Sequence, residues 1–169
     1  MSRLPRRQHA VKSPNQSRAR TPAGDALTDL IIPTIRLRAL FTTAGEAIAR
    51  PAGQTLARWL VLEAVAQTPS TVAQIARTMG LARQSVQRVA DLLERDGLTA
   101  YAENPDHRRA QLVQLTPDGL HALHTIQQAQ RVWADAVGAE IGESELRSAG
   151  AIIDLLLRVL VSRRQQGGY

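Results

Sequence analysis

Apolar residues recur at helical spacing through most of the chain, and prolines and glycines mark the points where the helices should end. The first such stretch covers residues 25–49. Its apolar positions are Leu27, Leu30, Ile31, Leu37, Leu40, Phe41, Ala44 and Ile48. Pro33 must kink this helix or restart it, because proline lacks the N–H that a helix interior uses. Pro51 and Gly53 indicate where it ends.

Two shorter helices follow, and each has a recognisable cap. Residues 56–67 form the second predicted helix, with Thr55 as its N-cap. The third begins after Thr71, whose hydroxyl can accept a hydrogen bond from the Gln74 N–H while the Gln74 side chain reaches back. It ends at Gly80, because glycine adopts positive φ without strain.

The fourth predicted helix covers residues 83–95 and ends at Gly97. Only a short turn containing Gly80 joins it to the third helix, which is typical of a helix-turn-helix. The apolar positions that would hold the pair together are Val72, Ile75, Ala76, Leu81, Val86, Val89, Leu92 and Leu93. The other side of the fourth helix carries polar residues, namely Arg83, Gln84, Gln87, Arg88 and Asp91.

A predicted hairpin comes directly after these two helices. Residues 98–103 and 109–115 are short strand-like runs, and the sequence Asn-Pro-Asp-His-Arg at 104–108 between them favours a turn. A hairpin in this place is a wing. The sequence therefore predicts a winged helix-turn-helix.

Two long helices complete the chain. Thr116 and Pro117 open the fifth, with threonine as N-cap and proline at the first helical position, and Gly138 and Gly142 frame a predicted break before the sixth. The apolar positions are Leu120, Leu123, Ile126, Ala129, Trp133, Ala136 and Val137 on the fifth helix, and Leu146, Ala149, Ile152, Ile153, Leu156, Leu157 and Leu160 on the sixth. The apolar faces of the terminal helices are too large for a small wing domain to cover, so we expect a homodimer.

Composition narrows the classes of function. Hydrophobic residues make up 44% of the chain and aromatic residues only 3%, so leucine, valine, isoleucine and alanine must fill the core. The absence of cysteine excludes disulfides and thiolate metal sites. No apolar run approaches the roughly 20 residues of a membrane span, and no secretory signal pattern is present. We therefore expect a cytoplasmic protein with no membrane partner.

The net charge of +6 is unevenly distributed. Residues 1–22 carry six basic residues and no acidic one, and the rest of the chain has 15 of each sign. Residues 1–24 also contain three prolines and are mostly polar, which predicts a disordered basic arm. A basic arm on a neutral body suggests a polyanionic partner, and a merely solvated leader is the alternative.

Two segments resemble a known family. They are TVAQIARTMGLARQSVQRVADLLERDGLTAY at residues 71–101 and NPDHRRAQLVQLTPDGL at residues 104–120. With them, residues 25–164 resemble the multiple-antibiotic-resistance regulator (MarR) family of transcriptional regulators. The resemblance implies a dimer built from the first, fifth and sixth helices, a recognition helix in the major groove and a wing in the minor groove. In many members, a small aromatic or lipophilic molecule releases the DNA.

The sequence departs from the family pattern at two positions. Ala82 stands where the family usually has serine as the N-cap of the recognition helix, and such a loss costs about 0.5–2 kcal/mol. His107 stands where an acidic residue is common, which leaves Asp106 as the partner expected to brace Arg108.

The candidate DNA-binding residues lie at the start of the fourth helix and in the wing. They are Arg83, Gln84, Ser85, Gln87, Arg88, Asp106, Arg108 and Arg109. Arginine suits the two acceptors of guanine, glutamine suits adenine, and a wing arginine can enter a narrow minor groove. A solvated polar helix face is the alternative for the helix residues. Arg108 can instead pair with Asp106, in which case Arg109 or His107 takes the groove.

Two further sets of residues have alternative interpretations. His121 and His124 lie three apart on the fifth helix, near Asp118, which allows either a metal site or a solvent-facing polar strip. We favour the strip, because no fourth ligand is evident. Trp59 and Trp133 can line an effector pocket or pack in the core or dimer interface. We favour packing.

The sequence thus predicts a mainly α, α+β winged-helix protein. Its expected parts are a basic arm (1–24), an N-terminal dimerisation helix (25–54), a winged helix-turn-helix DNA-binding domain (55–115) and C-terminal dimerisation helices (116–165). No catalytic motif is found, and no cofactor or metal is expected. The expected function is sequence-specific binding of double-stranded DNA by a homodimer, as a repressor relieved by a small-molecule effector. The alternative is a winged-helix module that binds only protein.

Overall fold

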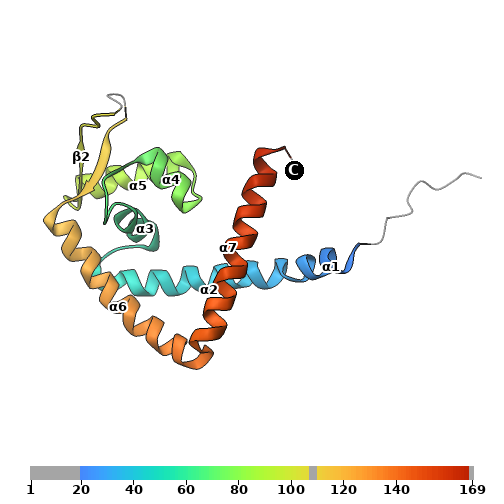
Figure 1. Cartoon of the computed structure of the whole chain (residues 1–169). Helices are drawn as coiled ribbons and strands as arrows, with labels where there is room; N and C mark the ends of the chain where they lie inside the picture. Colours follow the sequence, from blue (N-terminus) through green and yellow to red (C-terminus); the bar gives the residue numbers. More distant parts are fainter. Residues whose placement is uncertain (1–19, 107–109, 168–169) are drawn as a thin grey trace, which may run out of the picture. The chain divides into compact units, whose positions relative to one another are not determined.

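The computed structural model describes residues 20–106 and 110–167, and in this part the chain is mainly helical with one small sheet (Figure 1). The chain divides into two compact units, Met1–Ala39 and Leu40–Tyr169. Most of the predicted basic arm lies outside the described residues, as do His107, Arg108 and Arg109.

The predicted first helix is interrupted near Pro33. Helix α1 (Pro22–Asp29) and helix α2 (Ile31–Ala49) are separated at Leu30, so the proline restarts the helix, as one of the two predicted outcomes. Pro33 has no N–H to donate to the Asp29 carbonyl, which explains why the first helix ends there. Helix α1 also begins three residues earlier than predicted, because the Thr21 hydroxyl accepts a hydrogen bond from the Gly24 N–H at 3.1 Å.

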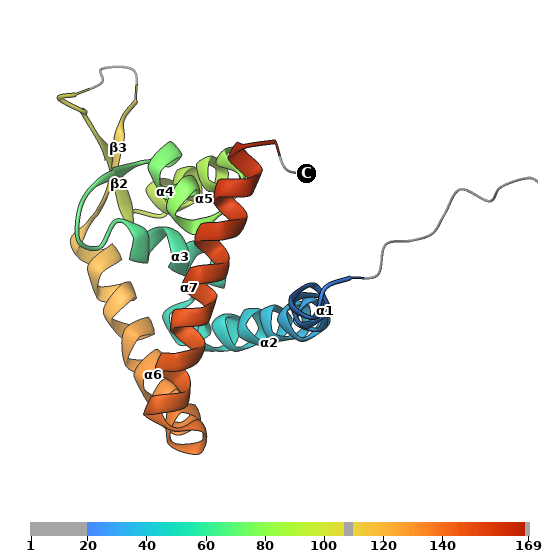
Figure 2. The same cartoon turned by 45° about the vertical axis from the view of Figure 1, so that its right-hand side comes forward.

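The second unit contains the predicted winged helix-turn-helix. Its elements after α2 are η1 (Arg50–Ala52), α3 (Leu56–Ala64), β1 (Ser70–Thr71), α4 (Val72–Met79), α5 (Arg83–Arg95), β2 (Thr99–Ala102), β3 (Leu112–Leu115), α6 (Pro117–Ile141) and α7 (Glu143–Gln165). The two strands of the wing, β2 and β3, pair antiparallel, and Tyr101 lies opposite Val113. Figure 2 shows α4 and α5 beside this hairpin.

Sequence reasoning missed the third strand of the sheet. Strand β1 is only two residues long and pairs antiparallel with β3, which gives the order β1-β3-β2. A two-residue strand has no alternation of apolar and polar positions to detect, and the sequence predicted only a break between helices there. Its effect is to attach the start of α4 to β3 of the wing.

Local caps set the ends of α4 as predicted, and α5 has its predicted bounds. The Thr71 hydroxyl accepts from the Gln74 N–H at 3.2 Å, and the Gln74 Oε1 accepts from the Thr71 N–H at 2.8 Å. Gly80 ends α4 with φ of 63°. Helix α5 covers the predicted residues 83–95. The preceding helix, α3, ends at Ala64, three residues before its predicted end.

Aliphatic side chains build the core, as the low aromatic content predicts. The largest fully buried side chains are Leu62, Ile75, Leu93, Leu123, Ile126, Val61, Val86 and Val113. They come from α3, α4, α5, β3 and α6, so α5 and the wing share one core with the start of α6. This common core holds the wing and α5 as one body.

Helix α6 continues through Gly138 to Ile141, so the predicted break framed by Gly138 and Gly142 comes at its second glycine. A single glycine inside a helix costs only about 1 kcal/mol, which a helix of 25 residues tolerates. The turn comes at Gly142, where φ is 100°, and α7 runs back at an angle to α6 (Figures 1 and 2). Among the described residues, no helix is long and apolar enough to cross a membrane.

Candidate nucleic-acid interface

The polar face of α5 is exposed along its first two turns. Val86, Ala90 and Leu93 point into the core. The five candidate residues of this helix, Arg83, Gln84, Ser85, Gln87 and Arg88, are all exposed. A helix with one buried face therefore presents its polar residues together, as binding in a major groove requires.

These polar residues form two rows. Arg83, Gln87 and Asp91 follow one another at intervals of four, so they share one side of the helix. With Tyr101 of β2 and the first residues of α4, they line a hollow of about 260 Å3. Gln84 and Arg88, also four apart, lie on the neighbouring row.

Gln87 belongs to a cluster of three hydrogen-bonded side chains. Its Nε2 donates to Asp91 Oδ1 at 2.8 Å and to the Tyr101 hydroxyl at 2.8 Å. The Tyr101 hydroxyl in turn donates to Asp91 Oδ1 at 2.6 Å. The cluster links the recognition helix to the first wing strand. The four-residue spacing of Gln87 and Asp91 is visible in the sequence, but the approach of Tyr101 depends on how the hairpin packs.

The cluster shifts the pKa values of both titratable members. Hydrogen bonds from Tyr101 and then from Gln87 stabilise the Asp91 carboxylate and lower its pKa from 3.8. Burial, together with the hydrogen bond to Asp91, raises the pKa of Tyr101 from 10.0 to about 12. Asp91 is therefore ionised and Tyr101 protonated at neutral pH, as the donor pattern of the cluster requires.

The N-terminus of α5 has no side-chain cap. Ala82 occupies the N-cap position with extended backbone angles, φ of −69° and ψ of 132°, and makes no capping hydrogen bond. The geometry suits a serine, threonine or aspartate, and only the side chain is missing.

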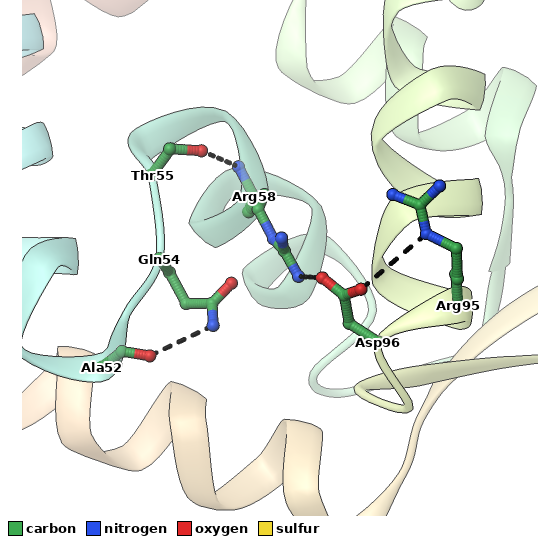
Figure 3. Close-up of polar contacts among 6 residues, drawn as sticks. All are labelled: Ala52, Gln54, Thr55, Arg58, Arg95 and Asp96. Carbon is green, nitrogen blue, oxygen red and sulfur yellow. Dashed lines mark hydrogen bonds and ion pairs between the residues drawn. The ribbon is translucent and has the colours of Figure 1, made fainter.

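The C-terminus of α5 is anchored to α3. Arg58 Nη2 donates to Asp96 Oδ2 at 2.7 Å, and the Arg58 side chain is only 19% exposed (Figure 3). Asp96 is the residue that ends α5, and Arg95 lies 3.9 Å from its other oxygen. Arg58 is itself held at the start of α3, where its N–H donates to the Thr55 hydroxyl. This contact, which sequence reasoning did not foresee, fixes the far end of the recognition helix.

The tip of the wing lies only partly within the described residues. Asp106 is exposed, and its N–H donates to Asn104 Oδ1 at 3.0 Å, which shapes the start of the turn. The expected pairing of Asp106 with Arg108, and the roles of Arg108 and Arg109, fall on residues that the structure does not describe. Beside the turn, Arg77 of α4 lines a second hollow, of about 720 Å3, together with Asn104 and Asp106.

The other candidate residues take part in packing or lie at the surface. Trp59 is buried, and its Nε1 donates to Glu63 Oε2 at 3.1 Å. Trp133 meets Phe41 edge to face, with ring centroids 6.1 Å apart. His121 and His124 are exposed on α6, and no group of three metal-binding side chains occurs among the described residues.

Sequence comparisons identify the family. Residues 52–110 match the model of the MarR family. An uncharacterized protein of Mycobacterium tuberculosis is 34% identical over 142 residues, which cover 84% of this chain and 97% of the relative. The chain belongs to the MarR family. A Thauera aromatica protein, named as a transcriptional regulatory protein for the hcr operon, is 29% identical to this chain over 72% of each chain.

Solved MarR structures share the fold. A MarR family transcription regulator aligns over 83% of this chain and 94% of its own, with a TM-score of 0.72 and 23% identity. The Mycobacterium tuberculosis regulator MosR, solved in complex with DNA, aligns over 78% and 96% of the chains, with a TM-score of 0.65 and 24% identity. CouR of Rhodococcus jostii, solved with p-coumaroyl-CoA, aligns over 76% and 91%, with a TM-score of 0.69 and 18% identity. The predicted winged-helix fold is thus confirmed.

Proposed function

We propose that this MarR-family protein binds a pseudo-palindromic DNA operator as a homodimer and regulates transcription, with α5 as the recognition helix. The observation that carries the proposal is the exposed polar face of α5, which presents Arg83, Gln84 and Arg88 on a helix fixed at its far end by Arg58. Arginine and glutamine at the start of such a helix match the acceptors and donors of base edges. The alternative, a module that binds only protein, does not need this combination.

The wing and the arm supply contacts to the backbone and the minor groove in this proposal. Arg108 or Arg109 enters the minor groove, where the negative potential is strongest. Residues 1–24 form a basic arm that contacts phosphates without reading bases. Arg77, which shares a hollow with the turn residues Asn104 and Asp106, is a further candidate for a phosphate contact.

Dimerisation is supported by the apolar surface of α7. Among the described residues, none of this 23-residue helix is buried. Its exposed large apolar side chains are Leu146, Ile152, Ile153, Leu155, Leu157, Val159, Leu160 and Val161. A second copy is the occupant that the family fold supplies for such a face, and the resulting symmetry explains a pseudo-palindromic site. In sedimentation at micromolar concentration, we expect a species of twice 18.4 kDa; a species of 18.4 kDa alone would reject the dimer.

We further propose that DNA binding represses transcription and that a small aromatic or lipophilic molecule relieves it. Support comes from two relatives of the fold: a Staphylococcus aureus MarR solved with salicylate and kanamycin, and CouR with p-coumaroyl-CoA. A reporter gene behind the operator tests the direction of control. Expression that rises when the protein is absent supports repression, and expression that falls rejects it.

The proposed function is tested by selection from a pool of random double-stranded DNA with the purified full-length protein. We expect an enriched motif with two related half-sites about one helical turn apart. Retention of all sequences alike, or of none, would favour the protein-only alternative.

A further inference from the structure

We propose that Gln87 reads the operator as a hydrogen-bond acceptor only, because Tyr101 and Asp91 hold its amide group in one orientation. Gln87 would then select a base that carries an amino group in the major groove, which is adenine or cytosine. The inference rests on the proposed DNA binding by α5. It assigns Gln87 as a specificity-determining residue, and Tyr101 and Asp91 as the residues that position it.

The orientation of the Gln87 amide follows from the chemistry of its neighbours. Asp91 Oδ1 lies 2.8 Å from Gln87 Nε2, and a carboxylate oxygen accepts hydrogen bonds but cannot donate them. With the amide turned over, two oxygens without a hydrogen between them would face each other at that distance. The NH2 group therefore points to Asp91 and Tyr101, and Oε1 points away from them.

The NH2 group of Gln87 faces the protein. Asp91 Oδ1 and the Tyr101 hydroxyl each lie 2.8 Å from Nε2 and 2.6 Å from each other, so both acceptors stand on the same side of the NH2 group. The Tyr101 hydroxyl donates its own hydrogen to Asp91. Among the described residues, Gln87 Oε1 accepts no hydrogen bond, and the side chain is exposed. What Gln87 can offer to DNA without breaking the cluster is thus a single acceptor.

A single acceptor reads bases differently from a free glutamine. A free glutamine pairs with adenine in a bidentate way, because its NH2 donates to N7 while its oxygen accepts from the N6 amino group. With the NH2 occupied, only the amino group can be recognised. Adenine and cytosine both present one in the major groove, whereas guanine and thymine present oxygens that repel Oε1.

The experiment is selection from random DNA with the full-length protein and its variants. For the wild type, we expect one position per half-site where adenine and cytosine are both accepted and guanine and thymine are disfavoured by about tenfold. Gln87→Ala should lose this preference at that position only. Gln84→Ala, which lies on the neighbouring row of α5, is the matched control and should change a different position.

Variants of the positioning residues separate orientation from mere structural support. In the double variant Tyr101→Phe with Asp91→Ala, the NH2 group is free, so adenine should become preferred over cytosine by about tenfold. Asp91→Asn keeps an oxygen that can accept from Gln87 and should retain the mixed preference. If the double variant unfolds, Tyr101→Phe alone removes one of the two acceptors that hold the NH2 group and should shift the preference in the same direction.

The inference makes three requirements. The wild type has to accept both adenine and cytosine at the Gln87 position. The ratio of adenine to cytosine has to change when the cluster is removed, and Gln87→Ala has to change the base preference at one position. Failure of any one, with a motif that still depends on Arg83, would reject the role of Gln87 and leave the proposed function standing. A wild-type pool with no motif would reject both.

Discussion

Side chains on the polar face of α5 differ in how many of their hydrogen-bonding groups the protein already uses. The NH2 group of Gln87 donates to Asp91 and Tyr101. Arg83 lines the same hollow and is exposed. Arginine carries five donors in a fixed fork, which suits the two acceptors of guanine.

At this scale, we expect Arg83→Ala to weaken binding to the selected operator by about 1–3 kcal/mol and to relax the preference at one base position per half-site. The reason is the loss of a bidentate contact. Titration of labelled duplex at fixed salt measures the change. Arg147→Ala, which removes an exposed arginine from α7, is the control and should leave the preference unchanged. An Arg83 variant with wild-type affinity and specificity would contradict the role.

The Tyr101 cluster also predicts a pH dependence. A raised pKa means that the phenol contributes stability in full below about pH 10, and that this contribution is lost as the pH rises through about 12. The lowered pKa of Asp91 has the opposite sense, since its contribution is present above 3.8 and is lost as the pH falls further. A difference titration of tyrosinate absorbance, wild type minus Tyr101→Phe, should give a midpoint near 12. A midpoint near 10 would show that the cluster does not form in solution.

The helices and strands differ in whether local sequence or tertiary packing determines where they form. The bounds of α4 follow from local signals, since Thr71 and Gln74 form the capping box and Gly80 takes positive φ. These features could be predicted from the sequence. Strand β1 and the approach of Tyr101 to α5 could not, because both depend on how the wing packs beside the two helices.

Because α5 lacks an N-cap side chain, we expect that adding one hydroxyl group at position 82 stabilises the helix. Ala82 already has the backbone angles of an N-cap, so Ala82→Ser should raise the free energy of unfolding by about 0.5–2 kcal/mol. Thermal or urea unfolding measures the gain. Ala57→Ser, on an exposed position inside α3, serves as the control and should give no gain. Equal effects at the two sites would argue against a capping role.

The junction of β2 and α6 predicts a contrast between two glycines. A Cβ at Gly119 would overlap the carbonyl oxygen of Leu98, so Gly119→Ala should destabilise the protein by about 1–3 kcal/mol. A Cβ at Gly138, in the same helix, would meet only Leu146, at 3.9 Å. Gly138→Ala should therefore stabilise α6 by about 0.5–1 kcal/mol. Unfolding of both variants in urea tests the contrast, and a tolerated alanine at 119 would contradict the tight junction.

The chain as a whole joins a winged helix-turn-helix to helices whose apolar faces are exposed. One core holds α3, α4, α5, the wing and the start of α6, whereas α7 buries none of its residues in the single chain. The periodicity of the terminal helices indicated this division in the sequence. It could not reveal the Arg58 to Asp96 contact, because the two residues are 38 positions apart. That contact joins the start of α3 directly to the end of α5.

The measurement that tests the central claim most directly is the ratio of two affinities at one physiological salt concentration. One duplex carries the selected pseudo-palindrome, and the other has the same length and composition in scrambled order. We expect the dimer to bind the palindrome at least about 10³-fold more tightly, as specific regulators do. Both affinities should fall as salt rises, because phosphate contacts release counterions. Equal affinity for the two duplexes would contradict sequence-specific recognition by α5.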